Sequence, residues 1–127
     1  MSRSARKSLL IAFGVIVLVG ASWVTYGQYN CQRRRVALHQ QMAGIERDAE
    51  RQLKPGTAKS VVTQFFTEHG IHFAILESEI VGELNTSGCS PLGCGSDAFT
   101  ILVHVKTDES GFVKEVPKVS GLYTNCL

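Results

Sequence analysis

The sequence lacks the motifs that usually reveal a biochemical activity. It contains no internal repeat and no low-complexity tract, and no spacing of its polar residues matches a known hydrolytic or acid–base pattern. Its formal net charge at pH 7 is only +2, and its basic residues have no interleaved aromatic residues on a common face. These absences leave a nucleic-acid partner without support and favour a non-catalytic protein that needs no cofactor.

What the sequence does contain is an almost unbroken apolar run from Leu9 to Tyr26, preceded by Arg3, Arg6 and Lys7. A membrane-spanning helix needs ~20 mostly apolar residues to cross ~30 Å of hydrocarbon. We therefore predict a basic cytoplasmic flank at residues 1–8 and a transmembrane anchor at residues 9–26. The side chains expected to contact the membrane are Leu9, Ile11, Phe13, Val15, Val17, Val19, Trp23 and Tyr26.

A cleaved signal peptide is the alternative to an anchor. Val19-Gly20-Ala21 fits a cleavage site, because small residues follow the apolar core there. Trp23 and Tyr26 beyond it fit the aromatic belt of a helix that leaves the bilayer. We favour the uncleaved anchor.

The cysteines indicate which side of the membrane the rest of the chain occupies. Basic residues flank the apolar run on both sides, with Arg33, Arg34 and Arg35 after it, so charge does not decide the orientation. All four cysteines follow the run, in a region small enough to benefit from disulfides, and these persist in oxidising compartments. We predict a single-pass protein of the inner (plasma) membrane with an extracytoplasmic C-terminal domain; a secreted or periplasmic protein is the alternative.

Residues 27–54 are expected to form a stalk helix. A narrow apolar stripe of Leu38, Met42, Ile45 and Ala49 recurs at helical intervals, and the stripe suits either packing on the domain or pairing with a second copy as a homo-oligomer. Pro55-Gly56 then breaks the chain and marks the start of a head domain at residues 55–127.

The head is expected to begin with a short helix. Thr57 is a candidate N-cap, Phe65 and Phe66 lie on the apolar face, and Gly70 is suited to the left-handed residue that ends a helix. Ile71 should then fold back onto Phe66, so that the two phenylalanines form the centre of the core.

Strand-like alternation follows this helix. Residues 71–81 predict a strand split near Glu77, and residues 99–106 predict a second strand. Residues 108–111 predict a hairpin turn that leads to a third strand at 112–119, placed at an edge because Pro117 cannot donate a ladder hydrogen bond. The predicted fold class is α+β: a transmembrane helix, a stalk helix, and one helix packed on a three- to four-stranded antiparallel sheet.

The loop predicted at residues 84–97 carries two of the cysteines. Cys89 and Cys94 are separated by a turn-rich Ser-Pro-Leu-Gly, which favours a local disulfide, and Cys31 and Cys126 would then form a second pair or remain free thiols. Redox exchange and metal binding are alternatives. Thiol exchangers use two intervening residues, however, and zinc would need two further ligands, for which His104 and Cys126 are the candidates.

The histidines do not form a recognisable catalytic pattern. His69 falls at a helix C-terminus, where an imidazolium is favoured by the helix dipole, and His72 and His104 fall on the polar face of strands. We expect them to be polar surface residues.

The order of these signals is similar to that of a known group of proteins. Pro55-Gly56-Thr57, the phenylalanine pair, Gly70-Ile71 and an Asp-x-x-Gly turn between alternating strands resemble SmpA/OmlA outer-membrane assembly lipoproteins and β-lactamase-inhibitor-like domains over residues 55–119. The tail at residues 121–127 looks like the end of other small bacterial envelope proteins. The resemblance implies a role in envelope assembly. It does not extend to lipidation, because Gln28-Tyr29-Asn30 before Cys31 is not a lipobox.

Together these features favour a membrane-anchored, extracytoplasmic, non-catalytic module that binds another envelope protein. The alternatives are an envelope thiol–disulfide enzyme or redox sensor that uses Cys89 and Cys94, and a secreted inhibitor-like protein released after Ala21.

Overall fold

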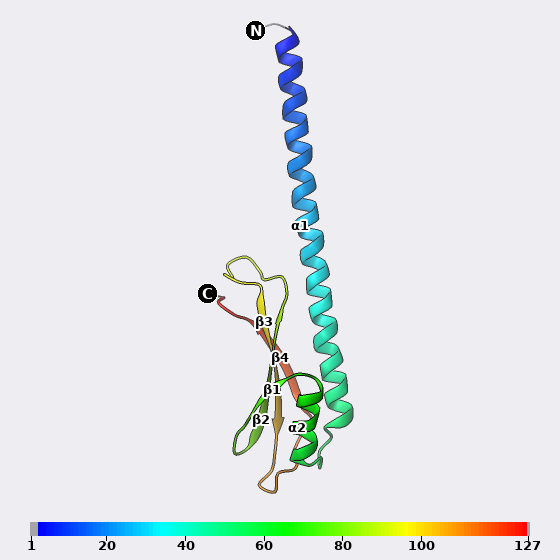
Figure 1. Ribbon diagram of the computed structural model, residues 1–127, viewed down its shortest axis with the longest axis vertical. Coiled ribbons are helices and arrows are strands. Elements are labelled where there is room, and N and C mark those ends of the chain that lie inside the picture. The colour runs from blue at the N-terminus through cyan, green and yellow to red at the C-terminus, as the bar shows by residue number, and fades with distance from the viewer. Residues whose placement is uncertain (1–2, 127) are drawn as a thin grey trace. The chain divides into compact units, whose positions relative to one another are not determined.

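The computed structural model describes residues 3–126 of the chain. Two helices precede four strands, as Figure 1 shows: α1 (Arg3–Gln52), α2 (Lys59–Glu68), β1 (His72–Ile75), β2 (Glu79–Ser87), β3 (Ala98–Lys106) and β4 (Lys118–Tyr123). The predicted α+β class is confirmed. The chain divides into two units, Met1–Arg33 and Arg34–Leu127, which we call the N-terminal unit and the C-terminal unit.

The predicted anchor and the predicted stalk are parts of one helix, α1. Its residues 3–33 belong to the N-terminal unit, and its residues 34–52 belong to the C-terminal unit. The helix ends before Pro55-Gly56, as expected, and Gly56 adopts a φ of 91°, which a side chain would disfavour.

The apolar stripe of α1 is part of the core of the C-terminal unit. Leu38, Ile45 and Ala49 are buried there with Leu53, and Met42 packs against them. The boundary predicted at residues 54–56 is therefore not the boundary of this compact unit, which starts at Arg34. The apolar stripe therefore supplies one side of the hydrophobic core of the C-terminal unit.

Helix α2 ends as its sequence predicts but begins differently. Gly70 has a φ of 65°, the N–H of Ile71 donates to the carbonyl of Phe66 at 2.8 Å, and that of Gly70 donates to Thr67 at 3.2 Å. This is the expected Schellman ending. The predicted cap at Thr57 is wrong, because the N-cap is Ala58, which has no side-chain cap, and the Thr57 carbonyl accepts from Val113 at 2.8 Å.

The four strands form an antiparallel sheet in the order β1-β2-β3-β4. The predicted split of the first strand is confirmed, since a turn at residues 76–78 separates β1 from β2. Two strand limits differ from prediction. β2 continues to Ser87, because residues 84–87 pair with β3, and the edge strand β4 begins after Pro117 rather than before it.

The core lies between one face of the sheet and the two helices. Phe65 and Phe66 of α2 are 1% and 0% exposed, and their rings contact edge to face with centroids 5.9 Å apart. The sheet contributes Ile80 and alternate residues of β3, and Ile71 packs with them. Figure 1 shows α2 and the C-terminal part of α1 on the same side of the sheet, so the opposite face has no helix over it. Along β3, that opposite face carries Thr100, Leu102, His104 and Lys106.

Candidate functional site

The predicted membrane residues lie on an exposed apolar helix. α1 is long and apolar enough to cross a membrane, and none of its most apolar stretch is buried within the protein. A membrane anchor and a signal sequence both meet this criterion. The exposed large side chains include every predicted contact residue: Leu9, Ile11, Phe13, Val15, Val17, Val19, Trp23 and Tyr26.

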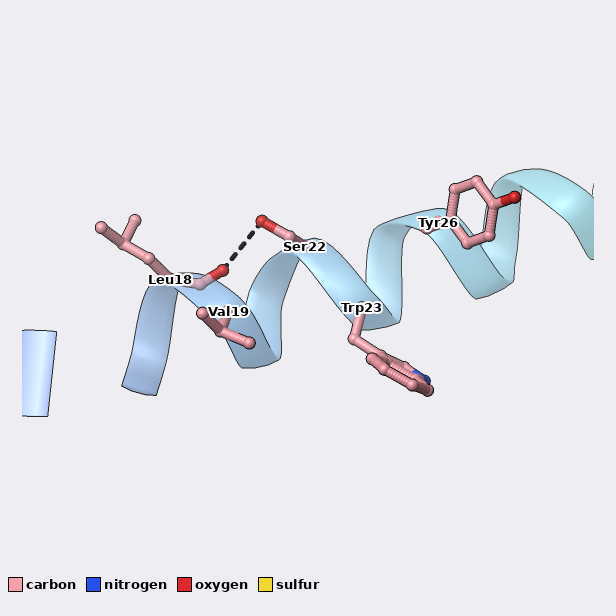
Figure 2. A pocket seen from close by; sticks show the side chains of 5 residues that line it. All are labelled: Leu18, Val19, Ser22, Trp23 and Tyr26. Atoms are coloured by element: carbon pink, nitrogen blue, oxygen red, sulfur yellow. Dashed lines mark hydrogen bonds between the residues drawn. The ribbon is translucent and has the colours of Figure 1, made fainter. Parts of the chain in front are cut away.

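The serine and threonine hydroxyl groups near the end of this stretch are satisfied by the helix itself. Figure 2 shows Ser22 Oγ donating to the carbonyl of Leu18, at 2.8 Å. Thr25 Oγ1 lies 3.0 Å from the carbonyls of both Ala21 and Ser22. A polar group in hydrocarbon needs an internal partner, because no water can replace it. The local bonds therefore make this part of the helix compatible with a lipid environment.

Figure 2 draws the side chains that line an open concavity of about 470 Å³ on this helix. It is lined by Leu18, Val19, Ser22, Trp23 and Tyr26, all on α1. Side chains from one helix cannot enclose a small molecule on several sides, as ligand pockets do. This surface is suited to contact with lipid chains or with another apolar helix.

The basic residues after the apolar run differ in their environments. The Arg33 guanidinium lies 5.9 Å from the ring centroid of Tyr29 in the N-terminal unit. Arg34 lies 3.5 Å from Asp97 within the C-terminal unit. Both contacts are at or near the surface, where such pairs stabilise proteins only weakly. They therefore do not prevent these arginines from contacting lipid headgroups.

All four cysteines are disulfide-bonded. Cys94 pairs with Cys126, with α-carbons 4.1 Å apart, so the predicted local Cys89–Cys94 ring is wrong, and so is the predicted Cys31–Cys126 pair. The physical reason lies in the sheet. β4 runs back along β3 to Tyr123, and the following residues then meet the 88–97 loop, where Cys94 and Cys126 form an antiparallel bridge.

The loop at residues 88–97 is held by further bonds from the end of β4 and from its own residues. Tyr123 Oη donates to the carbonyl of Cys89 at 2.8 Å, and the Gly95 N–H donates to Asn125 at 3.1 Å. Asp97 accepts from the N–H and the hydroxyl of Ser90, at 3.0 and 2.9 Å. These two hydrogen bonds, with a smaller contribution from Arg34, lower the pKa of Asp97.

A concavity of about 300 Å³ lies beside this loop in the C-terminal unit. Its lining is mainly apolar, with two basic side chains. The lining residues are Arg35, Leu38, His39, Met42, Cys89, Pro91, Phe99 and Tyr123. Among the described residues that line it there is no acidic side chain with which Arg35 or His39 could form an acid–base pair.

The histidines make structural contacts. His69 lies over the Phe65 ring with centroids 4.1 Å apart, and its Nε2 lies 3.4 Å from Asp48, which links α2 to α1. His104 Nδ1 lies 3.4 Å from Glu79 across the β2–β3 pair. The hydrogen bonds from Arg51 and His69 lower the pKa of Asp48. Within residues 3–126, no group of three or more potential ligands could hold a metal ion.

Comparisons with protein-family models, curated proteins and solved structures found no match to this chain. Any assignment of function therefore depends on the chain's own features. Sequence reasoning identified the apolar helix, but it missed the Cys94–Cys126 link and the exposed edge of β1. The signal for the disulfide was the strand-like alternation after Pro117, because this strand pairs with β3 and carries the tail back beside it.

Proposed function

We propose that this protein is a single-pass, extracytoplasmic, non-catalytic module of the bacterial inner membrane that binds another envelope protein. The observation that carries the proposal is an exposed apolar helix followed by a compact domain whose cysteines are all oxidised. An aqueous compartment would not tolerate so large an apolar surface without a partner. The disulfides suit an oxidising compartment.

The sheet supports a binding role for the domain. One face is packed on the helices, while within residues 3–126 no helix covers the other face and no further strand of the sheet pairs with the outer edges of β1 and β4. Such surfaces serve protein partners more often than small substrates, which need enclosed cavities with convergent polar groups. The resemblance of residues 55–119 to envelope assembly domains adds an assembly role to the proposal.

In-membrane crosslinking tests this function. Photoreactive residues placed at exposed positions of the C-terminal unit should yield one reproducible envelope partner. The Phe66→Ala variant should lose this adduct because its core is disrupted, while Val61→Ala, on the same helix but 42% exposed, should keep it. The absence of a reproducible partner from any exposed position would contradict the proposal, and release of a soluble chain that begins at Ser22 would favour the secreted alternative.

A further inference from the structure

Strand β1 presents unpaired main-chain groups at one edge of the sheet. The Leu76 N–H donates to the Glu79 carbonyl at 2.8 Å, and the register places Ile75 opposite Ile80. In an antiparallel pair, residues that bond to the partner strand alternate with residues that point away from it. The N–H and C=O groups of Phe73 and Ile75 therefore point away from β2, toward the open side of the edge.

The side chains of the same two residues are incompletely covered. Phe73 and Ile75 lie on the helix side of the sheet, yet they remain 39% and 49% exposed, and the next residue, Leu76, is 50% exposed. Phe73 is held in place by stacking on Phe66, with centroids 5.7 Å apart. The edge thus combines free main-chain groups with a fixed apolar surface.

A concavity of about 400 Å³ lies at the start of this strand. It is formed where the end of α2 meets β1. Its lining residues are Thr67, Gly70, Ile71, His72 and Phe73. In proteins that bind a peptide by adding a strand, main-chain hydrogen bonds supply affinity and pockets for alternate side chains supply specificity.

The charge around the edge indicates the chemistry of the occupant. Residues 60–105, which include β1, β2, most of β3 and all of α2 except its first residue, Lys59, contain no lysine or arginine. Acidic residues lie on both sides of β1, with Glu68 before it and Glu77 and Glu79 after it. Charge complementarity therefore favours a basic segment over an acidic one.

The opposite edge, β4, is less suited to this role. Pro117 precedes it directly and Lys118 is its first residue, and both residue types discourage strand addition. Val119 and Tyr123, its side chains on the helix side, pack against the core. β1 carries neither proline nor lysine.

We propose that the β1 edge accepts an extended, basic segment of another envelope protein as a fifth strand beside the existing four. Alternate apolar residues of that segment cover Phe73 and Ile75, one side chain enters the concavity at Gly70, and basic residues face Glu68 and Glu77. This proposal rests on the proposed binding function and names the surface and the class of partner.

The test uses the isotope-labelled full chain in zwitterionic detergent micelles. The probe is an octapeptide with blocked ends that alternates lysine with valine, and the controls are its glutamate–valine counterpart and an N-methylated version that cannot form a strand ladder. We expect the basic peptide to shift the amide signals of residues 72–76, and both controls to bind on the order of tenfold more weakly or not at all.

Two variants separate the contribution of a main-chain hydrogen bond from that of a side chain. Ile75→Pro removes an outward N–H, and Ile75→Ala shortens the same side chain but keeps that donor. Proline should weaken peptide binding on the order of tenfold relative to alanine, which is the effect of losing a main-chain hydrogen bond. Unchanged signals for residues 80–87 would show that the sheet remains folded in both variants.

Three results would overturn the proposal: no peptide-induced shifts at residues 72–76, equal binding of the acidic peptide, or concentration-dependent shifts at this edge without peptide, which would assign it to a second copy of the chain. Failure here is distinguishable from failure of the proposed function. A partner crosslinked only from the open sheet face or from β4 would retain the binding function and exclude the β1 edge.

Discussion

At the residue scale, α2 approaches the sheet closely at Gly82 of β2, because glycine has no side chain. A β-carbon added to Gly82 would lie 2.7 Å from both Ile71 Cγ2 and Phe66 Cε1. A β-carbon added to Gly44, on α1, would meet nothing within 4 Å. The two glycines therefore have opposite consequences when they are replaced.

We predict that Gly82→Ala lowers the free energy of unfolding by ~1 to 3 kcal/mol, because Phe66 and Ile71 are buried and must shift to admit the methyl group. Gly44→Ala should raise it by ~0.5 to 1 kcal/mol, since glycine is a poor helix residue. Urea unfolding of both variants measures the difference. Equal effects would show that α2 does not approach β2 as closely as described.

Asp97 gives the 88–97 loop a dependence on pH. Folding lowers the pKa of Asp97 below its ordinary value of 3.8, chiefly through the hydrogen bonds from Ser90. The carboxylate therefore stabilises the folded loop above pH 3.8, and this contribution is lost as the pH falls through the lower, folded-state pKa.

We predict that the amide signal of Ser90 titrates with a midpoint below 3.8 and that Asp97→Asn abolishes this titration. Ser96→Ala, beside Asp97 in the chain, serves as the matched control and should leave the midpoint below the ordinary value. A Ser90 midpoint at or above 3.8 in the unmodified chain would contradict the geometry of this loop.

At the element scale, the Cys94–Cys126 disulfide fixes the end of β4 to the loop between β2 and β3. The two residues are separated by 32 positions, so the link restricts a substantial part of the unfolded chain. Replacing both cysteines by serine should lower the free energy of unfolding by ~3 to 4 kcal/mol in the chain-entropy account. Hydrogen exchange should then accelerate at Gly95, whose N–H is bonded to Asn125.

Peptide mapping without reduction identifies the link directly. Leu92 lies between Cys89 and Cys94 and is fully exposed, so chymotrypsin can separate the two cysteines. The Cys94 peptide should remain attached to the Cys126 peptide. A link between the two fragments on either side of Leu92 would restore the local ring and contradict the described pairing.

The elements differ in how far their sequences could predict them. The apolar alternation of β3 and the Gly70-Ile71 ending of α2 are local signals, and both were predicted close to their observed limits. The limits of β2 and β4 depend on pairing with β3, which local composition does not contain. The disulfide partner of Cys94 was missed for the same reason, since it follows from where β4 runs.

The β1 edge shows the same limit on prediction. Residues 71–75 alternate as a half-buried strand should, yet the alternation could not reveal that the strand ends the sheet. Only the strand order exposes the outward main-chain groups of Phe73 and Ile75.

At the scale of the whole molecule, the chain combines a unit that exposes its apolar side chains with a unit that buries them. Among residues 3–126, the hydrophobic core has Leu38 as its first member, so the described part of the N-terminal unit contributes nothing to it. Burial in a bilayer would stabilise the first unit by removing its apolar side chains from water. The Cys94–Cys126 disulfide and a hydrophobic core stabilise the second.

Lysines on the two sides of the apolar run should differ in their accessibility when the chain is anchored in a membrane. Lys7 precedes it, whereas every other lysine follows it, and Lys54, Lys106, Lys114 and Lys118 are exposed on the C-terminal unit. An anchored chain with an extracytoplasmic domain should present only the second group to an impermeant reagent. Detergent-permeabilised spheroplasts, in which every exposed lysine reacts, provide the control.

The most direct test is therefore to treat intact spheroplasts with a membrane-impermeant amine reagent, wash the membranes with carbonate and map the modified lysines by mass spectrometry. We predict modified Lys54, Lys114 and Lys118, together with a retained, unmodified Lys7 peptide in the membrane fraction. Modification of Lys7 alone, or a soluble chain that begins at Ser22, would contradict the account.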